Sequence, residues 1–479
     1  MDYAAFMKDL APQDVFHHFY HLSQIPRDAG DYDGICTFMK AFAEEHGLAC
    51  TVDAAHNVII RKAASTGYEN KAPVMLTSHL DMVCEKTPDS THNFKTDPLT
   101  LIHEGDIVRA DRTTLGADDG IGMAMMMALL ANPSLRHPAI EAVFTADEET
   151  DMGGALGLDF SQFESRFVIN LDGFAVGCSA TGEMELEMHL PKSTVAADET
   201  LAQYRIWVDG LIGGHTGMEG MQQRGNANLL LNRVLAALEK RVEYQLLDFN
   251  GGNGRSSAFA TYAVCTVALA QKDAAALEEA VTQSQAGFSK EYAIRDSGVR
   301  VHFAPAEERK AQALSPQTQR KLRDLLTIVP DGVFTFSAEY PGHFEGASNL
   351  GVVRCEEKEI FLTALIRNAV PSIKDYLADR FFTACRLLDV GVEIEHDQAG
   401  WDKNLSPEHE ALLREIYPDQ ELLHFDGTLE CGIFCEGLPG CSVVSLAPVF
   451  YEMHSPTEYV HPSEVKTHYE RLLKLLERL

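Results

Sequence analysis

Basic side chains are scarce in this sequence. Its 479 residues contain 40 Lys and Arg against 71 Asp and Glu, which gives a formal net charge of −31 at pH 7. Nucleic-acid backbones and anionic membrane surfaces are bound through clusters of Lys and Arg, which this composition does not supply. We therefore expect a partner that is neither a nucleic acid nor a membrane.

Long apolar runs are missing as well. The longest, Ile121–Ala131, contains Gly122 and is shorter than the roughly 18 apolar residues of a membrane-spanning helix. The opening residues MDYAAFMKDLAPQD have neither the basic nor the apolar stretch of a secretory signal. Ten cysteines are spread from Cys36 to Cys441 without a dense framework, which is typical of reduced and mostly buried thiols. These absences predict a cytoplasmic protein.

The first part of the chain alternates predicted strands with predicted helices. Apolar residues make up 45% of the chain and charged residues 23%, values typical of a folded globular protein. Short apolar segments with β-branched or aromatic residues are predicted as strands at Val58–Arg61, Val74–Thr77, Ala139–Thr145 and Phe167–Leu171. Helices are predicted before the first of these strands, at Gly34–His46, and between the second and third, at Gly120–Ala131. This alternation predicts an α/β domain with a mostly parallel sheet flanked by helices.

The middle of the chain has a different pattern. In Thr181–Met188 apolar residues alternate with Glu, which is typical of a half-exposed antiparallel strand. Amphipathic helices are predicted at Ala227–Arg241 and Leu314–Leu326. An inserted α+β domain is therefore expected here.

The first pattern returns from about Trp401, with a predicted buried strand at Cys441–Ala447. We predict one α/β domain formed by residues 1–183 and 398–479, interrupted by the inserted domain at residues 184–397.

Side chains that can bind metal follow several of the predicted buried strands. The set, in chain order, is His79, Asp81, Asp118, Glu148, Glu149, Asp172 and His454. Because ligands of parallel sheets bind beyond the carboxyl ends of the strands, we expect these side chains to converge there. So many buried carboxylates would repel one another unless a cation neutralised them.

Taken singly, each of these residues has an ordinary explanation. A histidine after a strand is more often a core or surface residue than a ligand, Asp118 could cap the following helix, and adjacent glutamates usually lie in a solvated loop. Only their joint placement favours a metal site.

The donor types indicate which metal. Two imidazoles with several carboxylates suit Zn, Mn or Co better than Ca or Mg. They are too many for one tetrahedral zinc, whereas two ions about 3.5–4 Å apart, bridged by a carboxylate and a water, would use them all. Since residues i and i+2 of an extended chain point the same way, Asp81 can orient the His79 imidazole. One of Glu148 and Glu149 can bind metal while the other acts as general base.

Five motifs together resemble the M20 metallopeptidase family, and within it the aminoacyl-histidine dipeptidases, or carnosinases. In order they are TSHLDMV, LGADDGIG, TADEETDMGGA, INLD and MHSP. The resemblance covers essentially the whole chain, including Ile25-Pro26-Arg27 and the segment from Thr428 to Gly432. It implies a zinc-peptidase-like catalytic domain with an inserted lid domain.

The resemblance also implies a role for each residue of the set. It places His79 and Asp172 on one metal ion and Glu149 and His454 on the other, with Asp118 bridging them. Asp81 is then the orienting residue, and Glu148 acts first as base and then as acid. The family further implies a cis peptide bond between Asp118 and Asp119.

In the inserted domain, Gly213–Gly217 resembles the GGH(S/T)G element of the family lid. The resemblance implies that His215 stabilises the oxyanion, from the same chain or across a dimer. Asn349 and Arg367 resemble positions that hold the substrate, and Arg suits a free carboxylate because its guanidinium binds bidentately. Glu430 would receive the free amino group. The family also implies a homodimer formed through the lid domain.

This sequence departs from the family pattern at three places. Asp119 stands where relatives usually carry Asn, Met218–Met221 replaces the usual Asp-Ile-His, and Asp426 takes the place of a His. The predicted metal ligands are unaffected, but the substrate preference is left open.

We therefore predict a dinuclear-metal dipeptidase that hydrolyses dipeptides with free termini, such as Xaa-His or β-Ala-His, using two divalent ions, most simply zinc, with Mn or Co as alternatives. An N-acyl amino acid deacylase is the alternative with the same site. The alternative of another class is a non-catalytic protein that binds metal or peptide.

Overall fold

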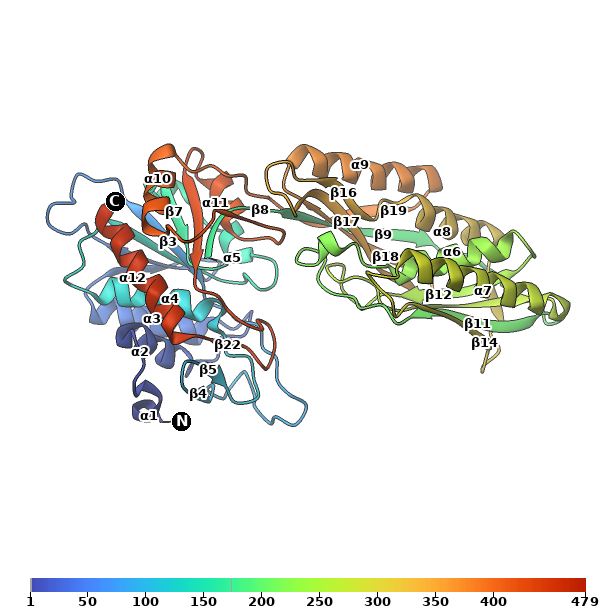
Figure 1. Ribbon diagram of the computed structural model, residues 1–479, viewed down its shortest axis with the longest axis horizontal. Helices are drawn as coiled ribbons and strands as arrows, with labels where there is room; N and C mark the ends of the chain where they lie inside the picture. The colour runs from blue at the N-terminus through green and yellow to red at the C-terminus, as the bar shows by residue number, and fades with distance from the viewer. Residues whose placement is uncertain (1, 174) are drawn as a thin grey trace. The chain divides into compact units, whose positions relative to one another are not determined.

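The computed structural model describes residues 2–173 and 175–479, which form two compact units (Figure 1). Unit 1 comprises the described residues of Met1–Ala180 together with Trp401–His424 and Leu429–Leu479. Unit 2 comprises Thr181–Gly400 and the short segment Phe425–Thr428.

Unit 1 is built on an eight-stranded sheet in the order β1-β2-β6-β3-β7-β21-β8-β20. The strands are β1 (Ala49–Val52), β2 (Val58–Lys62), β3 (Val74–His79), β6 (Ile140–Thr145), β7 (Phe167–Asn170), β8 (Ala175–Ala180), β20 (Leu423–Phe425) and β21 (Ser442–Ala447). The central strands β6, β3, β7 and β21 run parallel. Strands β3, β6, β7 and β21 consist entirely of buried residues, as expected of parallel strands covered on both faces.

Four helices of unit 1 pack with this sheet into one hydrophobic core: α2 (Gln13–Leu22), α3 (Asp33–Glu45), α4 (Ala117–Ala131) and α12 (Pro462–Arg478) (Figure 1). Helix α4 is buried all round from Ala117 to Leu130, because most of its side chains are Ala, Met, Leu or Ile. Unit 1 also contains α1 (Tyr3–Met7), β4 (Leu101–His103), β5 (Val108–Ala110), α5 (Gly153–Leu156), a 3-10 helix at Phe160–Gln162, α10 (Pro407–Ile416), α11 (Cys431–Gly437) and β22 (Tyr459–Val460).

Unit 2 is a nine-stranded antiparallel sheet in the order β14-β11-β13-β12-β17-β18-β9-β19, with β16 added beside β17. Its strands are β9 (Gly182–Pro191), β11 (Ala202–Asp209), β12 (Gln245–Gly251), β13 (Ala263–Leu269), β14 (Arg300–Pro305), β16 (Gly332–Phe336), β17 (Phe344–Cys355), β18 (Glu359–Asn368) and β19 (Gly391–Gln398). A separate pair is β10 (Thr194–Ala196) with β15 (Gln312–Leu314).

Four helices of unit 2 cover one face of its large sheet: α6 (Ala227–Glu239), α7 (Ala274–Glu291), α8 (Pro316–Ile328) and α9 (Pro371–Leu388) (Figure 1). The alternation of apolar residues with Glu that is predicted for β9 explains how this strand contacts the helices. Met184, Leu186 and Met188 are buried in the core with these helices, whereas the intervening glutamates are only half-buried.

The predicted fold class is confirmed for both parts. The main difference is the start of α4, which is at Ala117 and not at Gly120. Asp118 and Asp119 keep non-helical backbone angles there, so the regular helix does begin close to the predicted residue. The ten cysteines are free thiols, six of them buried. No helix among the described residues is long and apolar enough to cross a membrane.

Candidate metal centre

The parallel strands of unit 1 bring the predicted metal-binding side chains to one edge of the sheet. Strand β3 ends at His79, which lies in register with Thr145 at the end of β6. Beyond these ends the chain continues into Asp81 and into Glu148 and Glu149. The backbone registers thus explain why residues far apart in the sequence meet.

Two groups of possible ligands share Asp118. His79, Asp118 and Asp172 form one group, and Asp118, Glu149 and His454 form the other. In each group the ligand atoms lie within 4.8 Å of one another. Asp118 Oδ1 is 3.2 Å from His79 Nε2, and its Oδ2 is 3.3 Å from His454 Nε2. The two oxygens of one carboxylate therefore face two different imidazoles, the arrangement of a bridging ligand.

Glu148 belongs to a third group of possible ligands, together with His79 and Glu149. The ligand atoms of these three side chains also lie within 4.8 Å of one another. Burial raises the pKa of Glu148 well above its usual range, and the nearby carboxylates of Asp172, Glu149 and Glu430 add to this shift. The His79 imidazole acts in the opposite direction but does not cancel it. Burial and the neighbouring Asp118 likewise raise the pKa of Asp172. These shifts are the electrostatic cost of gathering carboxylates with few positive partners.

Asp81 contacts the Glu148–Glu149 loop in addition to the His79 imidazole. Its carboxylate accepts hydrogen bonds from the backbone N–H of Glu148 at 3.2 Å and of Glu149 at 3.1 Å. His79 Nδ1 is 3.2 Å from the Asp81 backbone oxygen and 3.7 Å from its carboxylate Oδ1. Burial opposes ionisation of Asp81, but His79 and the N–H of Glu149 lower its pKa overall. Asp81 thus fixes the Glu148–Glu149 loop as well as the imidazole.

Asp119, the first departure from the family pattern, is fully buried, and the Asp118–Asp119 peptide bond is cis, as the resemblance predicts. Its Oδ1 accepts a hydrogen bond from the backbone N–H of Gly122 at 3.1 Å. Burial raises the pKa of Asp119 to about 7. The extra carboxyl group therefore caps the start of the regular helix and is only partly charged at neutral pH.

Glu430 lies just before α11 and is 2% exposed. Thr145 Oγ1 donates to its Oε2 at 2.8 Å, whereas its Oε1 has no hydrogen-bond partner among the described residues. Burial raises the pKa of Glu430 to about 8. Such an acceptor suits a cationic group arriving from outside.

In unit 2, Arg367 on β18 is already engaged by neighbouring side chains. Its Nη1 is 2.8 Å from Glu183 Oε2, its Nε donates to Thr216 Oγ1 at 3.1 Å, and its Nη2 lies 3.1 Å from His215 Nε2. The predicted residues Arg367 and His215 are therefore neighbours. The sequence did not predict Glu183 as the partner of the guanidinium, because nothing in its pattern distinguishes it from Glu185 and the glutamates that follow.

Asn349 on β17 is also held in place. Its Nδ2 donates to the backbone oxygens of Ser256 at 2.7 Å and Ala258 at 3.0 Å. Asn349, Arg367 and Thr216 line one pocket within unit 2.

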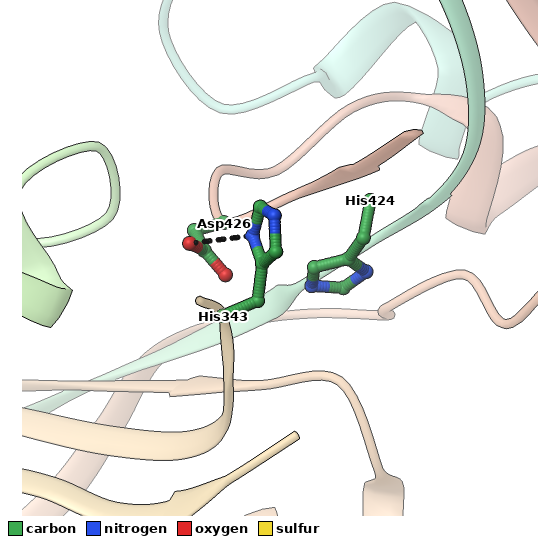
Figure 2. Close-up of side chains that lie close together, drawn as sticks. All are labelled: His343, His424 and Asp426. Atoms are coloured by element: carbon green, nitrogen blue, oxygen red, sulfur yellow. Dashed lines mark hydrogen bonds and ion pairs between the residues drawn. The ribbon is translucent and has the colours of Figure 1, made fainter. Parts of the chain in front are cut away.

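Asp426, another departure from the family pattern, belongs to unit 2 and pairs with His343. Figure 2 shows the contact, in which Asp426 Oδ2 lies 3.0 Å from His343 Nδ1. The Asp426 side chain is 11% exposed and that of His343 is 33% exposed. The carboxylate thus has an imidazole partner in its own unit.

Comparison with known proteins identifies the family. The model of peptidase family M20/M25/M40 matches residues 75–478. The chain belongs to this family. The cytosol non-specific dipeptidase of Escherichia coli (strain K12) is 31% identical over 485 aligned residues, covering 99% of each chain.

Two solved structures share the fold of this chain. An aminoacylhistidine dipeptidase from Vibrio alginolyticus superposes with a TM-score of 0.86 at 29% identity, over 99% of this chain and 98% of that one. An aminopeptidase from Bacillus cereus, with a TM-score of 0.55 and 14% identity over 98% of each chain, shares the fold alone.

Membership of a metallopeptidase family implies metal ions, and the donors of unit 1 suit them. Glu149 Oε1, a buried carboxylate oxygen, has no hydrogen-bond partner among the described residues. The two imidazoles and three carboxylates of the groups that share Asp118 are donors that zinc, manganese and cobalt accept. A pair of divalent cations would also relieve the repulsion that raises the pKa values of Glu148 and Asp172.

Proposed function

We propose that this chain is a cytosolic dinuclear-metal dipeptidase acting on dipeptides with free amino and carboxyl termini. The observation that carries this proposal is the sharing of Asp118 between two ligand groups, because single-ion chemistry needs no such carboxylate. Full-length similarity to a cytosol non-specific dipeptidase and to an aminoacylhistidine dipeptidase supports the substrate class.

The proposed ligands are His79 and Asp172 for one ion and Glu149 and His454 for the other, with Asp118 between them. Zinc is the simplest choice, with manganese or cobalt as alternatives. When bound, such a pair would polarise the scissile carbonyl and lower the pKa of a shared water from about 15.7 toward about 7.

Glu148 is the proposed proton carrier. Its carboxylate lies in one group with His79 and Glu149, close enough to reach a water at the proposed centre. Because a pair of cations would relieve the repulsion that raises the pKa of Glu148, its carboxylate could accept a proton from that water and later donate it to the departing amine. Asp81 keeps this side chain aimed through its hydrogen bond to the Glu148 backbone.

The free ends of the dipeptide have proposed partners of opposite charge. Glu430, with its unpartnered oxygen, would accept the amino group, and Arg367 with Asn349 would hold the carboxylate. His215, from this chain or from a second copy in a homodimer formed through unit 2, would donate to the oxyanion. Charged side chains that bind both the amino and the carboxyl terminus would limit the substrate to two residues.

A substrate panel with matched blocked substrates tests this proposal. Chain loaded with Zn, Mn or Co should hydrolyse Ala-His and β-Ala-His, and N-acetylation should reduce kcat/KM by at least about tenfold, because the Glu430 contact is lost. Faster hydrolysis of the acetylated form would identify an N-acyl amino acid deacylase instead. No turnover on the panel with any of the three metals would indicate a binding protein.

Light scattering checks the homodimer separately. A molar mass twice the 52.8 kDa of the chain is expected.

A further inference from the structure

A buried glutamate outside the proposed ligand set holds the backbone that carries Asp118. Glu458 is 2% exposed and lies four residues after His454. Its Oε2 accepts hydrogen bonds from the N–H of Leu115 at 2.7 Å and of Gly116 at 2.9 Å. Its Oε1 accepts from Ala117 at 2.8 Å and, more weakly, from Asp118 itself at 3.4 Å. One carboxylate therefore takes four consecutive backbone donors.

Arg27 holds the same backbone from its carbonyl side. It is 3% exposed, and its Nη2 donates to the Gly116 oxygen. Its Nη1 donates to the backbone oxygens of Leu80 at 3.1 Å and Asp81 at 2.6 Å. Gly116 has φ +63°, and a Cβ there would lie 2.6 Å from Arg27 Nη2, so the close approach requires glycine.

Consecutive backbone N–H groups that converge in this way form a nest, which ordinarily binds an external anion. Here the nest is filled by a side chain of the protein. Because the Asp118 carboxylate must face His79 and His454 at once, its Cα can move little. Four charge-assisted hydrogen bonds to the preceding backbone restrict that movement.

The segment that carries Glu458 also carries His454. The backbone N–H of Glu458 donates to the Ser455 oxygen at 3.1 Å, which closes a tight turn between the two. The turn thus delivers an imidazole to Asp118 Oδ2 and a carboxylate to the Asp118 backbone. A shift of this turn would displace both partners of Asp118 together.

We infer that Glu458 is a positioning residue for the bridging carboxylate, and that Arg27 completes the clamp by joining the Asp118 loop to the backbone of Asp81. This inference rests on the proposed function, because it assigns Asp118 to two ions. Neither residue belongs to the groups of possible metal ligands among the described residues, so both would act through the backbone that presents the ligands.

Manganese binding to Glu458→Gln in the full chain tests the inference. The amide keeps the size but offers one acceptor oxygen and turns an NH2 group toward backbone donors. We expect the affinity for the second Mn²⁺ ion to fall about 10–100-fold, as is usual when groups that orient metal ligands are altered. The exchange-coupled electron paramagnetic resonance spectrum of a carboxylate-bridged pair should change to that of isolated ions.

Glu464→Gln is the matched control, since Glu464 lies six residues further along the chain, on α12, and among the described residues its carboxylate accepts a hydrogen bond from the Tyr451 hydroxyl and from no backbone amide. It should retain both dissociation constants and the coupled spectrum. Folded Glu458→Gln with both dissociation constants within twofold of the native chain would overturn the inference. A native chain that binds fewer than two ions would instead overturn the proposed function.

If Glu458→Gln does not fold, the Glu458→Asp variant and hydrogen exchange of the native chain test the inference instead. The shorter Asp keeps the charge but draws back from the nest, so the same loss of spectral coupling is expected. In the metal-free native chain, the amides of Leu115–Ala117 should exchange slowly because Glu458 holds them. Unprotected exchange there would overturn the inference without any substitution.

Discussion

The carboxylates of the candidate metal centre in unit 1 and the buried Glu183 of unit 2 have different electrostatic surroundings. In unit 1, Asp118, Glu148, Glu149 and Asp172 lie at one sheet edge, and the groups of possible ligands found among the described residues there add two imidazoles, His79 and His454. In unit 2, Glu183 has a cationic side chain beside it, that of Arg367.

The pKa directions record this difference. Arg367 and His396 overcome the effect of burial and lower the pKa of Glu183 to about 2. The pKa of Glu148, in contrast, is raised well above its usual range by burial and like charges. The contrast teaches that Glu183 has its positive partners within the folded chain, whereas Glu148 lies among like charges that bound cations would neutralise.

Glu148→Gln should produce the largest effect, because it removes the only proposed proton carrier. We expect kcat to fall about 10²–10⁴-fold, the usual contribution of a general base. Metal content measured on the same preparation should remain two ions per chain, since Glu148 is not a proposed ligand. Near-native turnover in Glu148→Gln would remove Glu148 from this role.

Glu183→Gln tests the buried ion pair of unit 2. Leaving the Arg367 guanidinium buried without its carboxylate should cost about 3–5 kcal/mol, measured as the free energy of opening β18 in native-state hydrogen exchange. Metal content should not change.

The control is Glu291→Gln, which breaks an exposed glutamate–arginine pair in the same unit, with Glu291 Oε1 2.6 Å from Arg233 Nη2. Because both partners are solvated, about 0–1 kcal/mol is expected. Equal losses in Glu183→Gln and Glu291→Gln would refute the comparison.

Metal removal should act on unit 1 alone. Ligand binding at about 100 times its dissociation constant stabilises a fold by about 2.7 kcal/mol. Chelation should therefore speed exchange of the amides next to His79, Glu149 and Asp172, while β18 of unit 2 stays unchanged. Uniform acceleration in both units would contradict the idea that only unit 1 depends on cations.

Substitution of His468 should have the smallest effect on stability. This residue tests the effect of burial on a pKa in unit 1, apart from the effect of neighbouring carboxylates. It is buried with its Nε2 3.0 Å from the Leu446 oxygen, and burial lowers its pKa to about 4. Since the unfolded chain takes up this proton near pH 6.5 and the folded chain only near pH 4, stability falls as the pH decreases between these values.

At pH 5 the loss is about 2 kcal/mol relative to pH 7. Denaturation of His468→Gln at both pH values should show this part of the pH dependence removed. An unchanged pH dependence in His468→Gln would contradict the assignment.

The sequence predicted those features that repeat or recur in a pattern. The buried strands before His79, Glu148 and Asp172 were readable because parallel strands are continuous apolar runs, and β9 because its glutamates alternate with Met and Leu. Glu458 was not predicted, since a carboxylate that binds backbone amides some 340 residues away leaves no periodic signal. Arg27 was noticed only through a motif, without its partners.

The segment Phe425–Thr428 returns to unit 2 after the main chain has already left it at Gly400. The polypeptide therefore passes between the units four times, and Glu430 follows only two residues after the last passage. Exchange or deletion of Thr181–Gly400 alone would leave Phe425–Thr428 without the rest of unit 2, to which these four residues belong. A chimera that exchanges unit 2 between relatives would therefore have to replace both segments, Thr181–Gly400 and Phe425–Thr428.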